Sequence, residues 1–351
     1  MLRLLYLSDI HFEEPDCTNP RMDLASTDRD RLINDLQKIV ETTGQNIDAI
    51  LVTGDITYKA HTDEFSTAAL WLKKIADSNE IDESRIFVVP GNHDVNRQTA
   101  DSHIINSIRE RLDRQVEPAK NQLFLQNIKD EQSKEFILKP MQNYNEFAKQ
   151  YGCDLELPQK PFWTKYISID DKYKLCLNGL TTTFFSNKDD TPGSLYLGQF
   201  QAYFEQKAGT INLARFHHPK DWLNDGDAFD DLLSDNAQIW LSGHKHRQRY
   251  VADNRYLDLP SAAVNPSIWE AGTPGYNIID ISVCELGGEA NLDIAVMMRT
   301  LQETPKQFVA KKTFDGKDIL EHRIKIQKVA DINKQQTEAI KSPVANDLIK
   351  K

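Results

Sequence analysis

The sequence predicts an α/β fold, because short apolar runs alternate with amphipathic helical patterns in its N-terminal part. The apolar runs at residues 2–8, 49–53 and 86–90 have the length of strands. Helical patterns separate them, and this order predicts βαβ units with right-handed crossovers. The chain has 351 residues, of which 40% are hydrophobic and 27% charged, so a collagen, a coiled coil and a mostly disordered chain are excluded.

The elements follow in order along the chain. The first helical pattern has apolar residues three and four apart, a capping Ser26 or Thr27 and a terminating Gly44. The apolar face of this helix consists of Leu32, Ile33, Leu36, Ile39 and Val40, and that of the next helix of Phe65, Leu70, Leu72 and Ile75. Residues 95–152 carry helical stripes and no strand signal, which predicts a helical insertion.

The second half of the chain is predicted to be rich in strands. Alternating residues on both sides of Asp170 and Asp171 predict a hairpin. Further strands are expected at 211–216, 239–242, 278–283 and 292–298, and helices at 199–207 and 229–233. We expect a domain at 1–285 and a C-terminal extension at 286–351, with strands followed by a polar helical tail.

Composition limits the cellular setting and the partners. No apolar run approaches the ~18 residues of a membrane span, and the apolar N-terminus is too short for a signal peptide. We therefore expect a cytoplasmic protein with no membrane partner. The four cysteines are far apart and predict buried thiols, neither a disulfide framework nor a zinc knuckle.

The charge is unevenly distributed. A formal net charge of -11 disfavours non-specific nucleic-acid binding. Residues 302–351, however, carry more basic than acidic side chains, and the alternation around Ile324 and Ile326 suggests a strand with one basic face. This region is either a solvated end of the chain or a track for substrate phosphates. The basic residues concerned are Lys306, Lys311, Lys312, Lys317, Arg323, Lys325 and Lys328.

Polar clusters follow five of the predicted strands. Because the carboxyl ends of strands form the ligand crevice of α/β sheets, we expect these clusters to converge. In chain order they are Asp9-Ile10-His11, Gly54-Asp55, Gly91-Asn92-His93-Asp94, His217-His218-Pro219 and Gly243-His244-Lys245-His246.

The residue types in these clusters predict a metal site. Imidazole nitrogen and hard oxygen, without thiolate, suit octahedral Mn, Fe, Ni, Zn or Mg. Two ions bridged by a carboxylate would use all the candidate ligands. The candidates are Asp9, His11, Asp55, Asn92, His217, His244 and His246.

The ordered motifs D-x-H, G-D, G-N-H-D, H and G-H-x-H resemble those of the calcineurin-like metallophosphoesterase superfamily. The resemblance covers about residues 1–283 without the insertion, and it implies a four-layer α/β/β/α sandwich. It also implies a first metal on Asp9, His11, Asp55 and His246, and a second on Asp55, Asn92, His217 and His244. Two divalent ions are implied, and Mn is favoured among Mn, Fe, Ni and Zn.

The resemblance also implies the catalytic roles. His93 would protonate the leaving oxygen or steady the phosphoryl group, and Asp94 would orient His93 by accepting its other N–H. His218 is expected to support the ligands or to contact substrate, and Arg97 is a weaker candidate for touching a substrate phosphate.

The motifs also restrict the classes of substrate that are expected. Residues 54–60 lack the G-D-x-x-D-R-G of protein phosphatases, and His93 stands where lipid-A pathway hydrolases have Arg. The motifs look most like bacterial cyclic-nucleotide phosphodiesterases and related nucleases, so a nucleotide or nucleic-acid phosphodiester is expected. The insertion and extension leave room for a nuclease or defence-system effector with a protein partner. A phosphomonoesterase and a non-catalytic scaffold are the alternatives.

Overall fold

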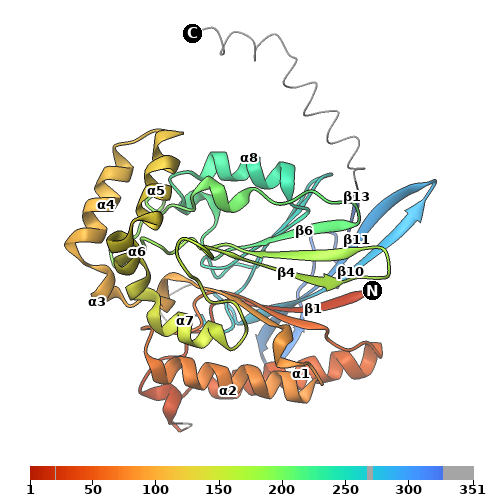
Figure 1. Cartoon of the computed structure of the whole chain (residues 1–351). Helices are drawn as coiled ribbons and strands as arrows, with labels where there is room; N and C mark the ends of the chain where they lie inside the picture. Colours follow the sequence, from red (N-terminus) through yellow and green to blue (C-terminus); the bar gives the residue numbers. More distant parts are fainter. Residues whose placement is uncertain (20, 267–271, 327–351) are drawn as a thin grey trace.

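The computed structural model describes residues 1–19, 21–266 and 272–326. Two sheets pack face to face, and helices cover the outer face of each (Figure 1). Helices α1 (Ser26–Thr43) and α2 (Thr62–Ser78) lie on the first sheet, and α8 (Gly226–Asn236) lies on the second. This arrangement of layers confirms the predicted fold class.

The first sheet has the strand order β12-β11-β10-β1-β2-β3, and β13 also pairs with β11. Strands β1 to β3 are parallel, and β10 joins the other side of β1 antiparallel. The strands that follow residue 285 therefore belong to the same sheet as the first strand, and the domain division at that residue stays a prediction. The bounds are β1 Leu2–Leu7, β2 Ala49–Thr53, β3 Ile86–Val89, β10 Gly275–Leu286, β11 Glu289–Glu303, β12 Lys306–Ala310 and β13 Leu320–Lys325.

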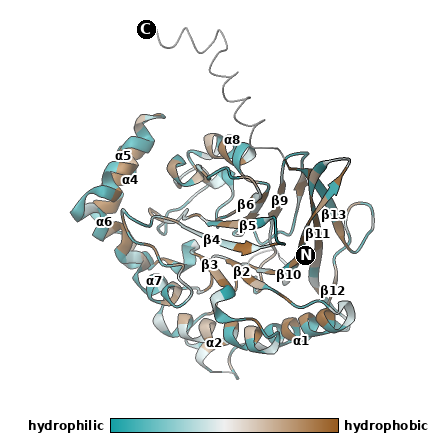
Figure 2. Ribbon diagram, turned by 45° about the vertical axis from the view of Figure 1, so that its right-hand side comes forward, coloured by the Kyte–Doolittle hydropathy of each residue, from teal (hydrophilic) through white to brown (hydrophobic). Residues whose placement is uncertain are grey.

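The second sheet has the order β4-β5-β6-β7-β9-β8. The predicted hairpin around residues 170–171 is its antiparallel β4–β5 pair, while β5, β6, β7 and β9 are parallel. Figure 2 shows the strands of both sheets as mainly hydrophobic, whereas the outer helices carry both colours. The bounds are β4 Trp163–Ser168, β5 Lys174–Gly179, β6 Thr210–Arg215, β7 Ile239–Ser242, β8 Val251–Ala252 and β9 Leu257–Pro260.

Strand β1 lies in the middle of the first sheet and is buried along its whole length. A strand covered on both faces is expected to be continuously apolar. Its one charged residue, Arg3, stands in register with Asp280 of β10 and makes a two-pronged ion pair with it, at 2.6 and 2.7 Å. This pairing explains how a cation is accommodated in the central strand.

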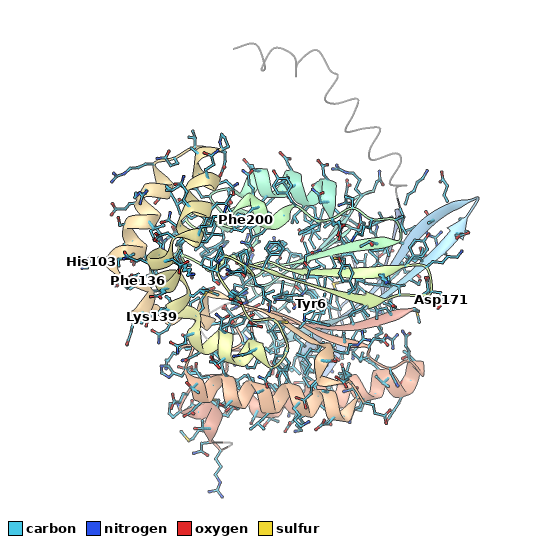
Figure 3. All side chains as sticks on the ribbon, in the orientation of Figure 1. Tyr6, His103, Phe136, Lys139, Asp171 and Phe200 are labelled. Atoms are coloured by element: carbon cyan, nitrogen blue, oxygen red, sulfur yellow. The ribbon has the colours of Figure 1, made fainter. Side chains whose placement is uncertain are left out.

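Two buried polar side chains link the sheets to each other. The hydroxyl of Tyr6, labelled between the sheets in Figure 3, donates to the carbonyl of Ser242 at 2.6 Å. Arg215 Nη2 donates to the carbonyls of Val52 at 2.7 Å and Phe87 at 2.8 Å. Burial lowers the pKa of Arg215 to about 10, so the side chain still carries a charge at neutral pH. These contacts hold β6 and β7 against β1, β2 and β3.

Helices follow one another through most of residues 97–149, as the predicted insertion requires. Figure 3 labels His103, Phe136 and Lys139 at this end of the molecule, opposite Asp171 in the β4–β5 turn. The hydroxyl of Tyr144 donates to the carbonyl of Val88 at 3.2 Å, which fixes the last of these helices against β3. The bounds are α3 Arg97–Ala100, α4 His103–Asp113, α5 Ala119–Lys129, α6 Glu131–Leu138 and α7 Gln142–Lys149.

Some local predictions were wrong. Residues 199–207 contain only a 3-10 turn, Gln199–Ala202, because the buried amide of Gln201 exchanges hydrogen bonds with the backbone of Thr181. Leu70, assigned to the apolar face of α2, is exposed. The predicted polar tail from about residue 331 and Lys328 lie outside the described residues. Within the described ranges, no helix combines the length and hydropathy needed to cross a membrane.

Candidate metal centre

Loops from both sheets meet to form the site. Those after β1, β2 and β3 come from the first sheet, and those after β6 and β7 come from the second. All five loops follow the carboxyl ends of parallel strands, where α/β sheets hold their ligands. Three clusters of side chains have ligand atoms within 4.8 Å of one another. They are Asp9, His11 and His246; Asp9, Asp55 and His217; and His217, His218 and His244.

Five of the predicted ligands have left-handed backbone conformations. Such a conformation is uncommon for a residue with a Cβ and costs about 1–3 kcal/mol, so it persists only where the surroundings enforce it. The sequence alone did not predict this backbone strain. It occurs at residues whose side chains converge on the candidate metal site. The φ values are 53° at Asp9, 53° at His11, 50° at Asp55, 69° at His244 and 53° at His246.

The first cluster surrounds Asp9, whose carboxylate is fully buried. Asp9 Oδ1 lies 3.1 Å from His246 Nε2 and 3.9 Å from His11 Nε2. Neither ring nitrogen of His11 has a hydrogen-bond partner among the described residues, although both are buried. A buried polar atom without a partner is costly, so His11 needs a ligand beyond those that the described residues supply.

The second cluster surrounds Asp55, which lies between the two sheets. Its Oδ2 is 3.1 Å from His217 Nε2 and 3.8 Å from His11 Nε2. His217 Nδ1 lies 2.7 Å from the carbonyl of Thr53, which only accepts, so Nδ1 carries a proton and Nε2 is the ligand nitrogen. This contact supports the choice of His217 as the metal-binding member of the His217-His218 pair.

The geometry at Asp55 and His217 suits a divalent ion. An imidazole lone pair and a carboxylate oxygen repel each other at 3.1 Å unless a proton or a cation lies between them. Burial lowers the pKa of His217, but Asp55 raises it to about 9, so a proton takes this place in the metal-free chain. Two adjacent ligands about 2.1 Å from one octahedral ion lie roughly 3 Å apart, which matches this pair.

His218 is fully buried and both of its ring nitrogens have partners. Nδ1 contacts the hydroxyl of Thr182 at 2.9 Å, and Nε2 contacts Asn92 Oδ1 at 3.0 Å. The amide oxygen of Asn92 is thereby held in place, with a second lone pair available. A substrate contact by His218 finds no support in this arrangement, and we propose instead that it positions Asn92. His244 completes this group of rings, 4.6 Å from His218 between centroids.

His93 lies at the edge of the site and is held from several directions. Its backbone N–H donates to Asp55 Oδ1 at 2.8 Å, and its Nδ1–H donates to the carbonyl of Tyr58 at 2.8 Å. The ring of Tyr58 stacks on it at 4.8 Å. The exposed Arg97 places Nη2 3.2 Å from His93 Nε2. Burial lowers the pKa of His93 to about 4, although Asp55 opposes this shift, so the neutral ring predominates.

The role predicted for Asp94 was wrong. Its carboxylate does not accept the ring N–H of His93, because the carbonyl of Tyr58 does so. Asp94 Oδ1 instead accepts from the backbone and hydroxyl of Thr57, and Oδ2 accepts from the N–H groups of Ile56 and Gly91. Asp94 therefore links the loops that follow β2 and β3. We propose that it supports the site by holding these loops and not by contacting His93.

Sequence reasoning also missed Thr53, Tyr58 and Thr182. Two of these act through backbone carbonyls, which every residue has, so no side-chain pattern could have indicated them. Tyr58 could have been found from the sequence, because it is an aromatic residue only three positions after the predicted ligand Asp55. Its ring stacks on His93.

Gly91 gives a test of how closely the loops approach. A Cβ at this position would overlap with the carboxylate and backbone N of Asp55. We expect Gly91→Ala to displace Asp55 and to weaken metal binding by about 10–100-fold, the usual loss when the support of a ligand is disturbed. Titration of each variant with the metal measures this affinity. The control is Gly287→Ala in the turn between β10 and β11, where the new Cβ meets nothing within 4 Å and only the left-handed backbone (φ 61°) is strained, so it shows the effect of lost stability alone. Unchanged affinity in Gly91→Ala would mean that Asp55 is not a ligand.

Comparisons with known proteins found a curated bacterial relative. The chain is 22% identical over 301 residues to YydB, a metallophosphoesterase-like protein of Bacillus subtilis (strain 168). This match covers 80% of the chain but only 57% of that relative, so the chain spans little more than half of its length.

The solved structures that the comparison found share little sequence with the chain. GAP50, the anchor in the inner membrane complex of Plasmodium, has a TM-score of 0.46 at 10% identity, over 93% of this chain and 89% of that one. Zinc-complexed Vps29 of Entamoeba histolytica has a TM-score of 0.32 at 12% identity, over 92% of this chain and 99% of that one. A model of the calcineurin-like phosphoesterase family matches residues 2–248, which is more than half of the chain. The chain therefore belongs to the calcineurin-like phosphoesterase family.

Proposed function

We propose that this protein is a dinuclear metal-dependent phosphodiesterase that hydrolyses a nucleotide or nucleic-acid phosphodiester. The observation that carries the proposal is the pair of buried carboxylates, Asp9 and Asp55, each 3.1 Å from an imidazole nitrogen. Family membership supports action on phosphoesters. The preference for a diester is supported by the likeness of the motifs around Asp55 and His93 to those of cyclic-nucleotide phosphodiesterases and nucleases.

The residues present fit two ions. Asp9, His11 and His246 would hold one ion, His217, His244 and Asn92 the other, and Asp55 would bridge them. Two bound divalent ions neutralise a phosphoester and lower the pKa of a water molecule between them. The absence of thiolate among the ligands favours Mn, Fe, Ni or Zn in an octahedral site, and we propose Mn.

The chain's own groups then place the substrate and handle the proton. Arg97 is exposed beside His93 and can reach a substrate oxygen. Tyr58 and Asp55 hold His93 through Nδ1 and the backbone N–H, and Nε2 lies beside Arg97 Nη2. The negative charge of a bound phosphoester would favour the protonated ring, which can donate to the leaving oxygen. Asp94 and His218 keep the surrounding loops and Asn92 in position.

Two experiments test the proposed function. Removal of metal tests metal dependence, and a comparison of an aryl diester with an aryl monoester tests the preference for diesters. We expect exhaustive chelation to abolish hydrolysis of bis(p-nitrophenyl) phosphate, and Mn²⁺ to restore it, because the buried ligands cannot neutralise the phosphoester by themselves. Hydrolysis of p-nitrophenyl phosphate serves as the comparison. A higher kcat/KM for this monoester would favour a phosphomonoesterase. Full activity without metal would contradict the mechanism, and no hydrolysis with any of the four metals would favour a scaffold.

A further inference from the structure

A cavity of about 400 Å³ opens beside the metal centre, on the side of His246. Its wall is formed by the segment after β7, by β11 and by the residue that follows β12. The residues that matter here are Arg247, Gln248, Arg249, Thr300 and Lys311, and we name this space the basic cavity. His246 belongs both to its wall and to the cluster around Asp9, so the cavity and the metal centre adjoin each other at this residue.

Within the part of the chain that the structure describes, the cations of the basic cavity have no acidic partner. Among the described residues, no carboxylate forms an ion pair with Arg247, Arg249 or Lys311. Lys311 Nζ donates to the carbonyl of Gln248 at 2.9 Å, and burial followed by the charge of Arg249 lowers its pKa. Three cations that share a cavity, with no acidic partner among the described residues, create a local positive potential that attracts an anion although the protein as a whole is acidic.

The other basic residues near the C-terminal strands, in contrast, form ion pairs with acids. The basic face predicted for β13 exists, but its charges are paired with acids, so the structure gives no support to a phosphate track there. Lys311 is the member of that predicted set, within the described residues, that has no acidic partner. The pairs are Lys306–Asp28, Lys312–Asp318, Lys317–Asp315, Arg323–Asp293 and Lys325–Glu289.

Gln248 provides a second, independent indication of a ligand. Its side chain is 93% buried, and Nε2 donates to the carbonyl of Tyr276 at 2.9 Å and to Asn277 Oδ1 at 2.7 Å. Its Oε1, in contrast, has no hydrogen-bond partner among the described residues. A buried acceptor without a partner requires a donor, such as a hydroxyl or amino group. Cations beside such an acceptor suit a phosphate attached to a sugar or base.

We propose that the basic cavity binds a second phosphate of the substrate, next to the phosphodiester that lies at the metal centre. The inference rests on the proposed function and specifies its substrate class. Oligonucleotides and phosphorylated dinucleotides have such a phosphate. A cyclic mononucleotide has a single phosphate, which the metal centre occupies, so it would leave Arg247, Arg249 and Lys311 without an anion.

Dinucleotides with and without a terminal phosphate test this assignment. The dithymidine monophosphate has one phosphodiester, and the same compound can carry an added phosphate at either end. The quantity measured is the ratio of kcat/KM with the added phosphate to kcat/KM without it. We expect a ratio well above one in the wild type for one of the two ends. Arg249→Gln and Lys311→Gln should each reduce this ratio about tenfold, the usual value of one charge-assisted hydrogen bond.

Arg85→Gln is the matched control, because it removes the same charge from an exposed arginine at the opposite end of β3. It should leave the ratio unchanged. A purely structural role of Arg249 would lower both rates equally and leave the ratio at its wild-type value. That result, or an equal fall in Arg85→Gln, would overturn the proposal.

A binding experiment separates this proposal from the proposed function. Fluorescence anisotropy of a labelled oligothymidylate, with the protein in EDTA, requires no catalysis. We expect Arg249→Gln to weaken binding about tenfold and Arg85→Gln to have no effect. If the wild type hydrolyses no diester, the proposed function fails, and this difference still supports the basic cavity as a phosphate site. Equal binding by both variants would refute it.

Discussion

Asp55→Asn is expected to lower phosphodiester hydrolysis by about 10³-fold or more. The carboxylate of Asp55 faces His217 and His11 through Oδ2 and holds the backbone of His93 through Oδ1. An amide has the same shape but lacks the charge that lets one group serve two ions. Loss of the several kcal/mol that such ions contribute to the transition state corresponds to this factor. Metal content should fall with activity.

The fold should survive this change, because the new amide can donate to His217 Nε2 and the remaining oxygen can still accept from His93. Circular dichroism and a thermal melt check this point. Asp77→Asn, on the exposed surface of α2, is the control for the lost charge. Retention of both ions and of most activity in Asp55→Asn would contradict the bridging role.

His93→Gln should lower kcat by about 10²–10⁴-fold while both ions stay bound. This is the usual contribution of a positioned acid–base group, and a glutamine cannot transfer the proton. The imidazole is held by the carbonyl and ring of Tyr58, and His93 belongs to none of the three clusters of possible ligands among the described residues. Steady-state kinetics and metal analysis on the same sample measure the two effects separately.

His61→Gln is the matched control, because His61 is a half-exposed histidine that pairs with Glu14 on the surface. It should have no effect on kcat. If His93→Gln loses metal in proportion to activity, His93 acts as a ligand and its assignment as a proton donor is refuted.

The strands and the motif clusters could be predicted from the sequence, because each depends on local composition. Residues 49–53 and 86–89 are apolar runs of strand length, and polar residues follow them directly. The helical insertion could be predicted in the same way, because its apolar stripes have helical spacing. One residue of these stripes, Tyr144, bonds to the carbonyl of Val88 in β3. Such features are encoded within a few neighbouring positions.

What could not be predicted depends on contacts between distant atoms. The orienting partner of His93 is a backbone carbonyl, and Asp94 is used for loop backbone instead. Which basic residues find an acidic partner depends on where the acids of the surface lie: among the described residues Arg323 pairs with Asp293, whereas Lys311 Nζ bonds only to the carbonyl of Gln248. Residues 199–207 have a helical composition, but the bonds of Gln201 to Thr181 determine their conformation.

The pairing of β1 with β10 has a consequence for how the chain is made. Leu2 stands opposite Ile281, so the first strand emerges from the ribosome long before its neighbour is synthesised. Until then one edge of a strand that is apolar except for Arg3 has no partner, and such an edge pairs readily with other chains. Contacts this distant in sequence also slow folding. A nascent chain that stops short of β10 would already contain every metal-binding motif and yet be prone to aggregate, so chaperone protection matters most over this interval.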